Sequence, residues 1–420
     1  MNEIITLKSG LRVSYENLPY AHSVCIGVFF GAGSRRETAE INGISHLLEH
    51  VCFKGTEKRS AFQIVCDVDA LGANVNAYTT KEMTAYYIQS ICEYVDKAAE
   101  ILSDLVLHHT IPEDELEREK EVVIEEINMC EDDPDDLSSD LVAKAYWGDS
   151  PLSRPILGTA ENVRRFTRED IFDYERRYYV SGNCVISITG NISREDALNL
   201  VEKYFNVREG KVEPYVEEEP SSPKLISVVK ENEQANINLA FRGLGFSASD
   251  DLASIILSSV FGGSMSSVLF QILREQMGLA YSVSAYDSAY IGKTTGVFNI
   301  YIGTSNEKAE VAIKKILDII KDYRENGFSE EEFQRGYSQL KGAYVMGFDS
   351  PLTLMRVNAK YALAGLTFNV DEIMKKMEKV TLADVNRLFD FYTENPPAMG
   401  YVGKKPDFDI ERVLYGDRDE

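Results

Sequence analysis

Two halves of the sequence repeat the same order of predicted elements, and this repeat favours a fold built from two similar domains. Residues 41–55 align without gaps on residues 249–263, and apolar residues coincide in both segments. Leu47, for example, aligns with Ile255. A β-rich run precedes each segment, at 23–30 and 235–241.

The ends of the two halves also correspond. Thr167 and Thr381 each stand where an N-cap is expected before a helix, because a threonine hydroxyl can accept a hydrogen bond from the first turn. A short apolar strand that ends in glycine follows each helix. Strands alternate with helices in both halves, so we expect an α+β fold of two homologous domains, each a mainly antiparallel sheet backed by helices. The expected boundaries are 1–211, an acidic proline-rich linker at 212–224, and 225–420.

The composition is that of a globular protein with an acidic surface. Apolar residues make up 44% of the 420 residues, and the formal net charge is −24. This charge opposes nucleic-acid binding, because phosphate contacts need a basic face. No segment has the roughly 20 consecutive apolar residues of a membrane helix. The N-terminal residues show neither a secretory nor a transit pattern, so we expect a cytoplasmic location.

The cysteines and histidines are confined to the first half. The chain has 6 cysteines and 5 histidines, and no two cysteines form a C-x-x-C pair. We therefore expect reduced, mostly buried thiols and neither a zinc ribbon nor a redox motif. Chemistry that uses imidazole must come from the first half. The adjacent His108 and His109 are interpreted as a surface feature at the end of a helix, with no assigned role.

A single H-x-x-E-H sequence lies in the first aligned segment. His46 and His50 are four residues apart and lie about one helical turn from each other, so both imidazoles can bind one metal ion. Glu49 lies on the same side and can take a proton from a metal-bound water and later deliver it to a leaving amine. A helix that carries histidines by chance is the alternative. The second half argues against it, since its aligned helix keeps the packing face with Ser254, Leu257 and Ser258 at these positions.

A third protein ligand is expected, because hydrolytic zinc sites usually have three and keep one position open. The strongest candidate segment is a predicted helix from Pro112 to Asn128, whose first residue is a favourable helix start. Most of its many acids are expected to face solvent. On the residues alone, Glu119, Glu125 and Glu126 all remain candidates.

The motifs extend beyond these residues and resemble one family of zinc peptidases. The matching segments are Gly33-Ser-Arg, Glu37, Gly43-Ile-Ser-His-Leu-Leu-Glu-His and Phe53-Lys-Gly-Thr56. They resemble the pitrilysin, insulysin and mitochondrial processing peptidase family of inverted-motif enzymes, in particular its bacterial processing-protease type. The resemblance runs over both halves of the chain.

This resemblance implies a site. It implies one Zn²⁺ per chain, with Glu126 as the third ligand, and Glu119 as the acid that holds the geometry and charge of the site. The segment that contains Asn76 and Ala77 resembles the family's edge strand, where an extended substrate adds as a further strand. In the second half, Arg274 and Tyr281 match the family's arginine and tyrosine, which implies that they hold substrate carbonyls and stabilise the oxyanion. On composition alone, Asn76 is about equally typical of a turn or bulge residue.

The function expected from these observations is zinc-dependent endopeptidase activity on extended peptides or presequences. The resemblance implies that two domains form half of a clamshell chamber, and therefore a homodimer or a heterodimer with a zinc-free homologue. The acidic charge favours basic peptide substrates. The alternatives are a non-catalytic peptide-binding clamp and a core subunit of a larger complex. A metallohydrolase for phosphorylated small molecules is disfavoured, because no phosphate-binding glycine motif occurs.

Overall fold

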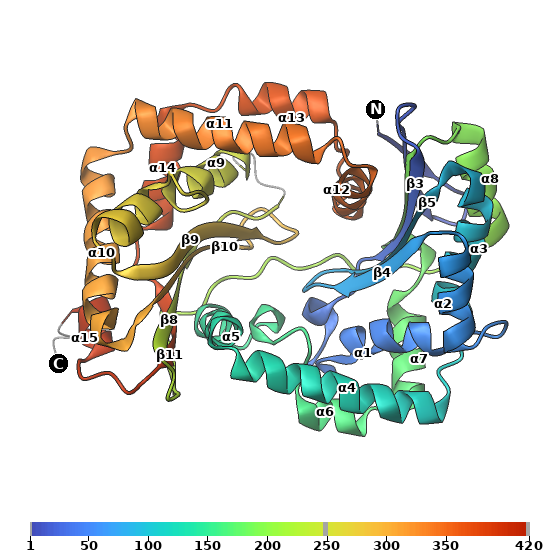
Figure 1. Ribbon diagram of the computed structural model, residues 1–420, viewed down its shortest axis with the longest axis horizontal. Coiled ribbons are helices and arrows are strands. Elements are labelled where there is room, and N and C mark those ends of the chain that lie inside the picture. Colours follow the sequence, from blue (N-terminus) through green and yellow to red (C-terminus); the bar gives the residue numbers. More distant parts are fainter. Residues whose placement is uncertain (1, 247–250, 417–420) are drawn as a thin grey trace. The chain divides into compact units, whose positions relative to one another are not determined.

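The computed structural model describes residues 2–246 and 251–416, which fold into two compact units (Figure 1). Unit 1 comprises the chain up to Asn128, Arg154–Pro214 and Val345–Ile373. Unit 2 comprises Met129–Ser153, Tyr215–Tyr344 and the chain from Met374 onward. Ser249 and Asp250, which begin the second aligned segment, lie outside the described residues. No helix in the described part of the chain has the length and apolar character needed to cross a membrane.

Unit 1 contains a six-stranded sheet in the order β1-β2-β6-β3-β5-β4. The strands are β1 (Glu3–Thr6), β2 (Arg12–Asn17), β6 (Cys184–Gly190), β3 (Ser23–Phe30), β5 (Thr84–Ile91) and β4 (Asn74–Thr79). Neighbouring strands are antiparallel except β2 and β6, so the sheet is mainly antiparallel as expected. β4 lies at one edge of the sheet, which leaves one side of its backbone unpaired within the sheet.

Helices cover both faces of this sheet. Those that pack on its strands are α1 (Ile44–Val51), α2 (Ala61–Ala70), α3 (Val95–Leu107), α8 (Arg194–Tyr204) and α12 (Pro351–Leu363). The chain of this unit also forms α4 (Glu113–Asp132), α6 (Ala160–Arg165) and α7 (Arg168–Tyr178). α12 lies on the opposite side of the sheet from α3 and α8 (Figure 1). β3 is apolar almost throughout because both of its faces are covered. Val24 and Ile26 join the core under α1 and α3, whereas Cys25 and Phe29 pack with Met355 of α12.

Unit 2 contains a five-stranded sheet in the order β7-β11-β8-β10-β9. The strands are β7 (Leu225–Val229), β11 (Ala398–Gly403), β8 (Gln234–Arg242), β10 (Gly296–Ser305) and β9 (Ala280–Ala289). Only β7 and β11 run parallel, and the other neighbouring pairs are antiparallel. The helices that lie wholly in this unit are α5 (Pro134–Trp147), α9 (Asp251–Phe261), a π-helix (Phe270–Gln276), α10 (Ala309–Asn326), α14 (Leu382–Tyr392) and α15 (Ile410–Tyr415). Two further helices, α11 (Glu330–Gly347) and α13 (Val370–Met377), have residues in both units. The expected fold class is therefore confirmed in both units.

The repeat is visible in the structure, except that one helix of each chain half packs on the sheet formed by the other half. Thr167 and Thr381 are the N-caps of α7 and α14, and each forms a capping box with the aspartate three residues later. The compact units nevertheless do not follow the chain halves strictly. α5 belongs to the first half of the chain and packs on β8 and β11 of unit 2, while α12 belongs to the second half and packs on β3 and β6 of unit 1. Gly400 allows the first contact, because a Cβ there would lie 2.4 Å from the Ser138 carbonyl oxygen.

Candidate metal centre

The H-x-x-E-H residues lie on α1, whose start is fixed by a buried glutamate. Glu37 accepts hydrogen bonds from the backbone N–H of Gly43 at 2.8 Å and from the backbone N–H and hydroxyl of Ser45 at 2.9 and 2.6 Å. A carboxylate at a helix N-terminus satisfies N–H groups that have no partner within the helix. Gly43 has φ +101°, and a Cβ there would lie 2.6 Å from the Leu157 carbonyl oxygen. These contacts set the direction of α1.

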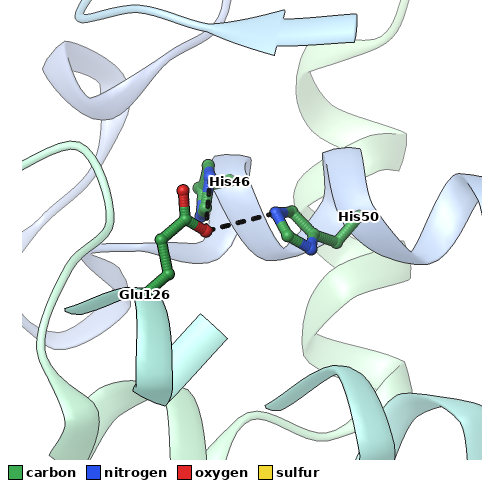
Figure 2. Close-up of side chains that lie close together, drawn as sticks. All are labelled: His46, His50 and Glu126. Carbon is green, nitrogen blue, oxygen red and sulfur yellow. Dashed lines mark ion pairs between the residues drawn. The ribbon is translucent and has the colours of Figure 1, made fainter. Parts of the chain in front are cut away.

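His46, His50 and Glu126 bring three potential metal ligands together (Figure 2). The Glu126 carboxylate reaches from α4 toward both imidazoles, with its Oε2 3.7 Å from His46 Nε2 and 3.6 Å from His50 Nε2. One ligand atom from each residue lies within 4.8 Å of the other two. His46 is buried, whereas the side chain of Glu126 is 43% exposed, so the group opens to solvent on the glutamate side.

Glu119 contacts the ring nitrogen of His50 that does not face Glu126. Its Oε2 is 3.2 Å from His50 Nδ1, and its Oε1 is 2.7 Å from Lys54 Nζ. When Nδ1 carries the proton, it donates a hydrogen bond to Glu119, and the Nε2 lone pair is left free for a metal. Burial opposes ionisation of Glu119, but the hydrogen bonds from His50 and Lys54 outweigh it and lower the pKa of this carboxyl group. Glu119 is therefore a charged partner that orients His50.

The two histidines have different electrostatic environments. Burial, and to a lesser extent the neighbouring His50, lower the pKa of His46 to about 4, so its imidazole is neutral near pH 7. For His50, burial alone would lower the pKa. The hydrogen bond to Glu119 and the charges of Glu126 and Glu49 outweigh burial and leave the pKa of His50 raised.

Glu49 lies in the same turn of α1 but has another contact. Its Oε2 accepts a hydrogen bond of 2.6 Å from the hydroxyl of Thr79, the last residue of β4. Burial raises the pKa of Glu49, and the bond from Thr79 partly opposes this shift. A carboxylate with a raised pKa binds a proton more readily, as a general base requires. The contact also ties this carboxylate to the edge strand.

The donor set fits zinc. Zinc is usually bound by imidazole nitrogens and carboxylate oxygens at roughly 2.0–2.1 Å, which places tetrahedral ligands about 3.4 Å apart. Glu126 Oε2 lies 3.7 and 3.6 Å from the two Nε2 atoms, close to that spacing. The His50–Glu119 pair supplies the outer carboxylate that metal-binding histidines commonly have.

Asn76 and Ala77 lie on the edge strand β4, which pairs with β5 without a register shift, so the turn or bulge alternative for Asn76 does not occur. Asn76 Oδ1 accepts a hydrogen bond of 2.8 Å from the backbone N–H of Ala77. The backbone N–H of Ala77 therefore already has a hydrogen-bond acceptor within the chain. A peptide that adds to β4 would compete for the same donor.

Arg274 and Tyr281 belong to unit 2, whereas the residues around His46 belong to unit 1. Arg274 lies in the π-helix, with its guanidinium carbon 4.9 Å from the centre of the Phe270 ring. Tyr281 lies on the edge strand β9 and is 59% exposed. The role of both residues in catalysis stays a prediction.

The surface interpretation is correct for His108 and wrong for His109. His109 is buried, with its Nδ1 3.6 Å from Cys52 Sγ and its Nε2 3.4 Å from a Glu175 carboxylate oxygen. Both partners come from distant parts of the sequence, so the adjacent residues gave no sign of this contact. Lys54, Thr79 and Glu37 were also not assigned from the sequence, because their contacts with the site arise only in the folded chain.

Comparisons with known proteins place the chain in a family. The family model described as "Insulinase (Peptidase family M16)" matches residues 12–160, and that described as "Peptidase M16 inactive domain" matches residues 165–340. The "Uncharacterized zinc protease YmxG" of Bacillus subtilis is 40% identical, and the match covers 91% of this chain and 93% of that protein. The "Uncharacterized zinc protease SCO5738" of Streptomyces coelicolor is 32% identical, covering 97% and 91%.

Solved structures show the same fold. A peptidase M16 inactive domain from Pseudomonas fluorescens matches with a TM-score of 0.90 and 20% identity, covering 96% of this chain and 98% of the other. A protease from Helicobacter pylori matches with a TM-score of 0.89 and 22% identity, covering 96% and 99%. The chain therefore belongs to peptidase family M16, which confirms the resemblance seen in its motifs.

Proposed function

We propose that this protein is a zinc-dependent endopeptidase. The observation that carries the proposal is the meeting of His46, His50 and Glu126, with ligand atoms within 4.8 Å of one another, in a chain of peptidase family M16. The names of the zinc protease relatives support the metal and the reaction class. His46, His50 and Glu126 would hold one zinc ion per chain.

The chain's own residues have distinct roles in this proposal. Zinc, when bound, would supply a Lewis acid that polarises water and the substrate carbonyl. Glu49 accepts a proton from the attacking water and gives it to the leaving amine, which its raised pKa favours. Glu119 keeps His50 oriented through the contact at Nδ1. Arg274 and Tyr281 are proposed to bind substrate carbonyls and the developing oxyanion.

The proposed substrate is an extended peptide that pairs with β4. Asn76 and Ala77 lie on this edge strand, and Thr79 at its end contacts Glu49, so the strand leads to the proposed base. Pairing through the backbone places few demands on the side chains of the peptide. The net charge of −24 favours peptides rich in lysine and arginine.

The proposal extends to the assembly of the protein and to its location in the cell. We propose that two such chains, or one chain and a zinc-free homologue, form the working chamber. The six cysteines are all free thiols, which supports a reducing compartment such as the cytoplasm. Native mass measurement distinguishes a homodimer from a monomer that needs another partner.

The first test compares the wild-type protein with Glu49→Gln. Both are loaded with zinc, and their zinc content is measured by atomic spectroscopy. We expect about one zinc per chain in both proteins, cleavage of a quenched-fluorescent basic peptide by the wild type, and a loss of at least about a hundredfold in kcat/KM in the variant. Equal zinc content shows that the loss comes from the base and not from the metal.

Two other outcomes would contradict the proposal. Zinc-loaded wild-type protein that binds peptides without cleaving them, in its native assembly, indicates the non-catalytic peptide-binding alternative. Zinc-dependent cleavage that persists in Glu49→Gln indicates another base.

A further inference from the structure

An arginine of α12 that the chemistry described above does not use lies against two tyrosines of the unit 1 sheet. Arg356 is half-buried, and its guanidinium carbon lies 4.7 Å from the centre of the Tyr87 ring and 5.5 Å from that of Tyr78. Tyr87 belongs to β5 and Tyr78 to the edge strand β4. These three residues form an arginine–tyrosine cluster on the face of the sheet that α12 covers (Figure 1).

The positive charge of Arg356 has no carboxylate partner among the described residues of the chain. Its Nη2 donates a hydrogen bond to the hydroxyl of Tyr87, and its buried Nε has no acceptor in the part of the chain that the structure describes. Aromatic rings attract a cation, but a charge that is taken out of water is usually paired with an opposite charge. The two buried arginines of unit 1, Arg35 and Arg59, both pair with carboxylates. A carboxylate from outside the chain would complete the cluster around Arg356 in the same way.

Arg12 shows that a half-buried arginine can also be compensated by a helix end. Its Nη1 donates a hydrogen bond to the carbonyl oxygen of Ala362 in the last turn of α12, where the helix carries partial negative charge. Arg356 lies in the second turn of the same helix, away from that end. The helix therefore does not neutralise Arg356.

Strand β4 has the proposed base on one face and the arginine–tyrosine cluster on the other. The Thr79 hydroxyl contacts Glu49, and Ala77 packs against the core under α1, whereas Tyr78 packs with the side chains of α12. Successive side chains of a strand point to opposite faces, and the same holds for a peptide that pairs with β4. The side chains of such a peptide therefore point alternately toward the metal centre and toward the cluster.

The cluster adjoins the free edge of β4. Asn76 stands directly opposite Tyr87 in the register of β4 and β5 and is exposed, and Tyr78 lies two residues further along on the same face. Opposite side chains on neighbouring strands have Cβ atoms about 4.5–5.5 Å apart. A peptide strand beside β4 therefore places a side chain next to Asn76 or Tyr78, on the face where Arg356 lies.

We propose that the arginine–tyrosine cluster binds a carboxylate of the substrate, from a residue whose side chain points toward α12. The proposal rests on the proposed peptidase function. The guanidinium group of Arg356 presents a planar fork that matches the two oxygens of a carboxylate, and the two tyrosine rings hold this fork in place. The preferred substrates are then basic peptides that carry one acidic residue near the cleaved bond.

The test uses quenched-fluorescent peptides with serine around a single cleavable bond. One glutamate is moved through the four positions on each side of that bond, and at each position a glutamine peptide is the neutral control. We expect kcat/KM to be about tenfold or more higher for glutamate than for glutamine at one position, because a hydrogen-bonded charge is gained. The ratio should be near one at the two adjacent positions, since those side chains point to the other face.

A second peptide pair identifies the source of the carboxylate. These peptides end at the preferred position with either a free carboxylate or an amide. A gain for internal glutamate shows that a side chain is bound, whereas a gain only for the free chain end shows that the cluster binds a C-terminus. A ratio near one in both series overturns the proposal.

Substitutions of two arginines separate binding from packing. Arg356→Gln should bring the ratio of glutamate to glutamine close to one, and Arg356→Lys should keep part of it, because the charge remains but the fork is lost. Arg12→Gln is the matched control, since it removes the same charge from a half-buried residue that also contacts α12, but from β2 near the opposite edge of the sheet from β4. We expect the full ratio in Arg12→Gln. An equal loss in both glutamine variants would show that the packing of α12 is responsible and would overturn the proposal, and thermal unfolding shows whether each variant is folded.

Binding of the same peptides to zinc-loaded Glu49→Gln separates this proposal from the peptidase proposal. Cleavage by the wild type without a preference for a carboxylate at any position overturns the role of the cluster and leaves the peptidase intact. Absent cleavage, together with a glutamate-dependent affinity that the added Arg356→Gln change removes, overturns the peptidase and supports the cluster. Absence of both cleavage and carboxylate-dependent binding overturns both.

Discussion

Glu119 and Glu126 show how two acids on one helix serve different purposes. Both lie on α4, seven residues apart, so they fall on nearly the same side of it. Glu119 is buried and ion-paired with Lys54, whereas Glu126 is partly exposed and faces both imidazoles. Glu119 already contacts His50 and Lys54, and Glu126 is the acid of this pair that we propose as the metal ligand.

A pair of neighbouring glutamates tests the ligand assignment. Glu126→Gln should lower zinc affinity by more than the roughly 10–100-fold that loss of an outer partner costs, because a direct ligand is replaced by a neutral amide. Glu125→Gln is the control, since Glu125 is exposed and is not in the metal-ligand group. Zinc affinity is measured by competition with a chelator of known affinity. Similar losses in both variants would show that the net charge of α4 matters and not the single ligand.

At the scale of elements, α12 is the helix that completes unit 1. It covers the face of the sheet opposite to α3, and the Ser187 hydroxyl of β6 donates a hydrogen bond of 2.9 Å to the carbonyl oxygen of Met355. Asn358 donates a further bond of 2.9 Å to Glu16 of β2. The helix therefore binds the sheet through both apolar packing and buried hydrogen bonds.

Shortening the Met355 side chain of α12 should destabilise unit 1. Met355 is 0% exposed, and Met355→Ala should lower the free energy of unfolding of the surrounding strands by about 2–5 kcal/mol, because it leaves a cavity. Hydrogen exchange of β3 and β6 amides measures this change without assuming that a chain of two units unfolds in one step. Met346→Ala is the control, since Met346 is 70% exposed, and a change within about 0.5 kcal/mol is expected. Unchanged protection of β3 in Met355→Ala would contradict the packing role of α12.

At the scale of the whole molecule, the exchange of α5 and α12 makes each unit depend on both halves of the chain. The segment 1–211 lacks the helix that covers Cys25 and Phe29, and the segment 225–420 lacks the helix that packs on β8 and β11. An uncovered apolar sheet face favours aggregation.

The two halves, produced separately, should therefore be poorly soluble, and produced together they should form a soluble one-to-one complex. Gel filtration and soluble yield measure this outcome. A full-length chain cut by a protease at a site inserted in 212–224 after folding is the control, and its pieces should stay together. Two separate halves that are each soluble and cooperatively folded would contradict the dependence.

The sequence by itself predicted the local features. Helix periodicity places His46, Glu49 and His50 within one turn of each other, and threonine caps begin α7 and α14, because these relations depend on residues only three or four apart. The alternation of strands and helices predicted the fold class for a similar reason. The family resemblance, now confirmed, added the expectation for Glu126.

Tertiary structure decided the contacts between distant segments. It brought Glu126 and not the equally acidic Glu125 to the imidazoles, buried His109 against Cys52, and placed α5 and α12 on the sheets formed mainly by the other halves of the chain. Each of these depends on the packing of elements that are far apart in sequence. Residue type and spacing fix the pattern of a helix face, but the free energy of burying that face is determined only by the surface that it meets in the fold.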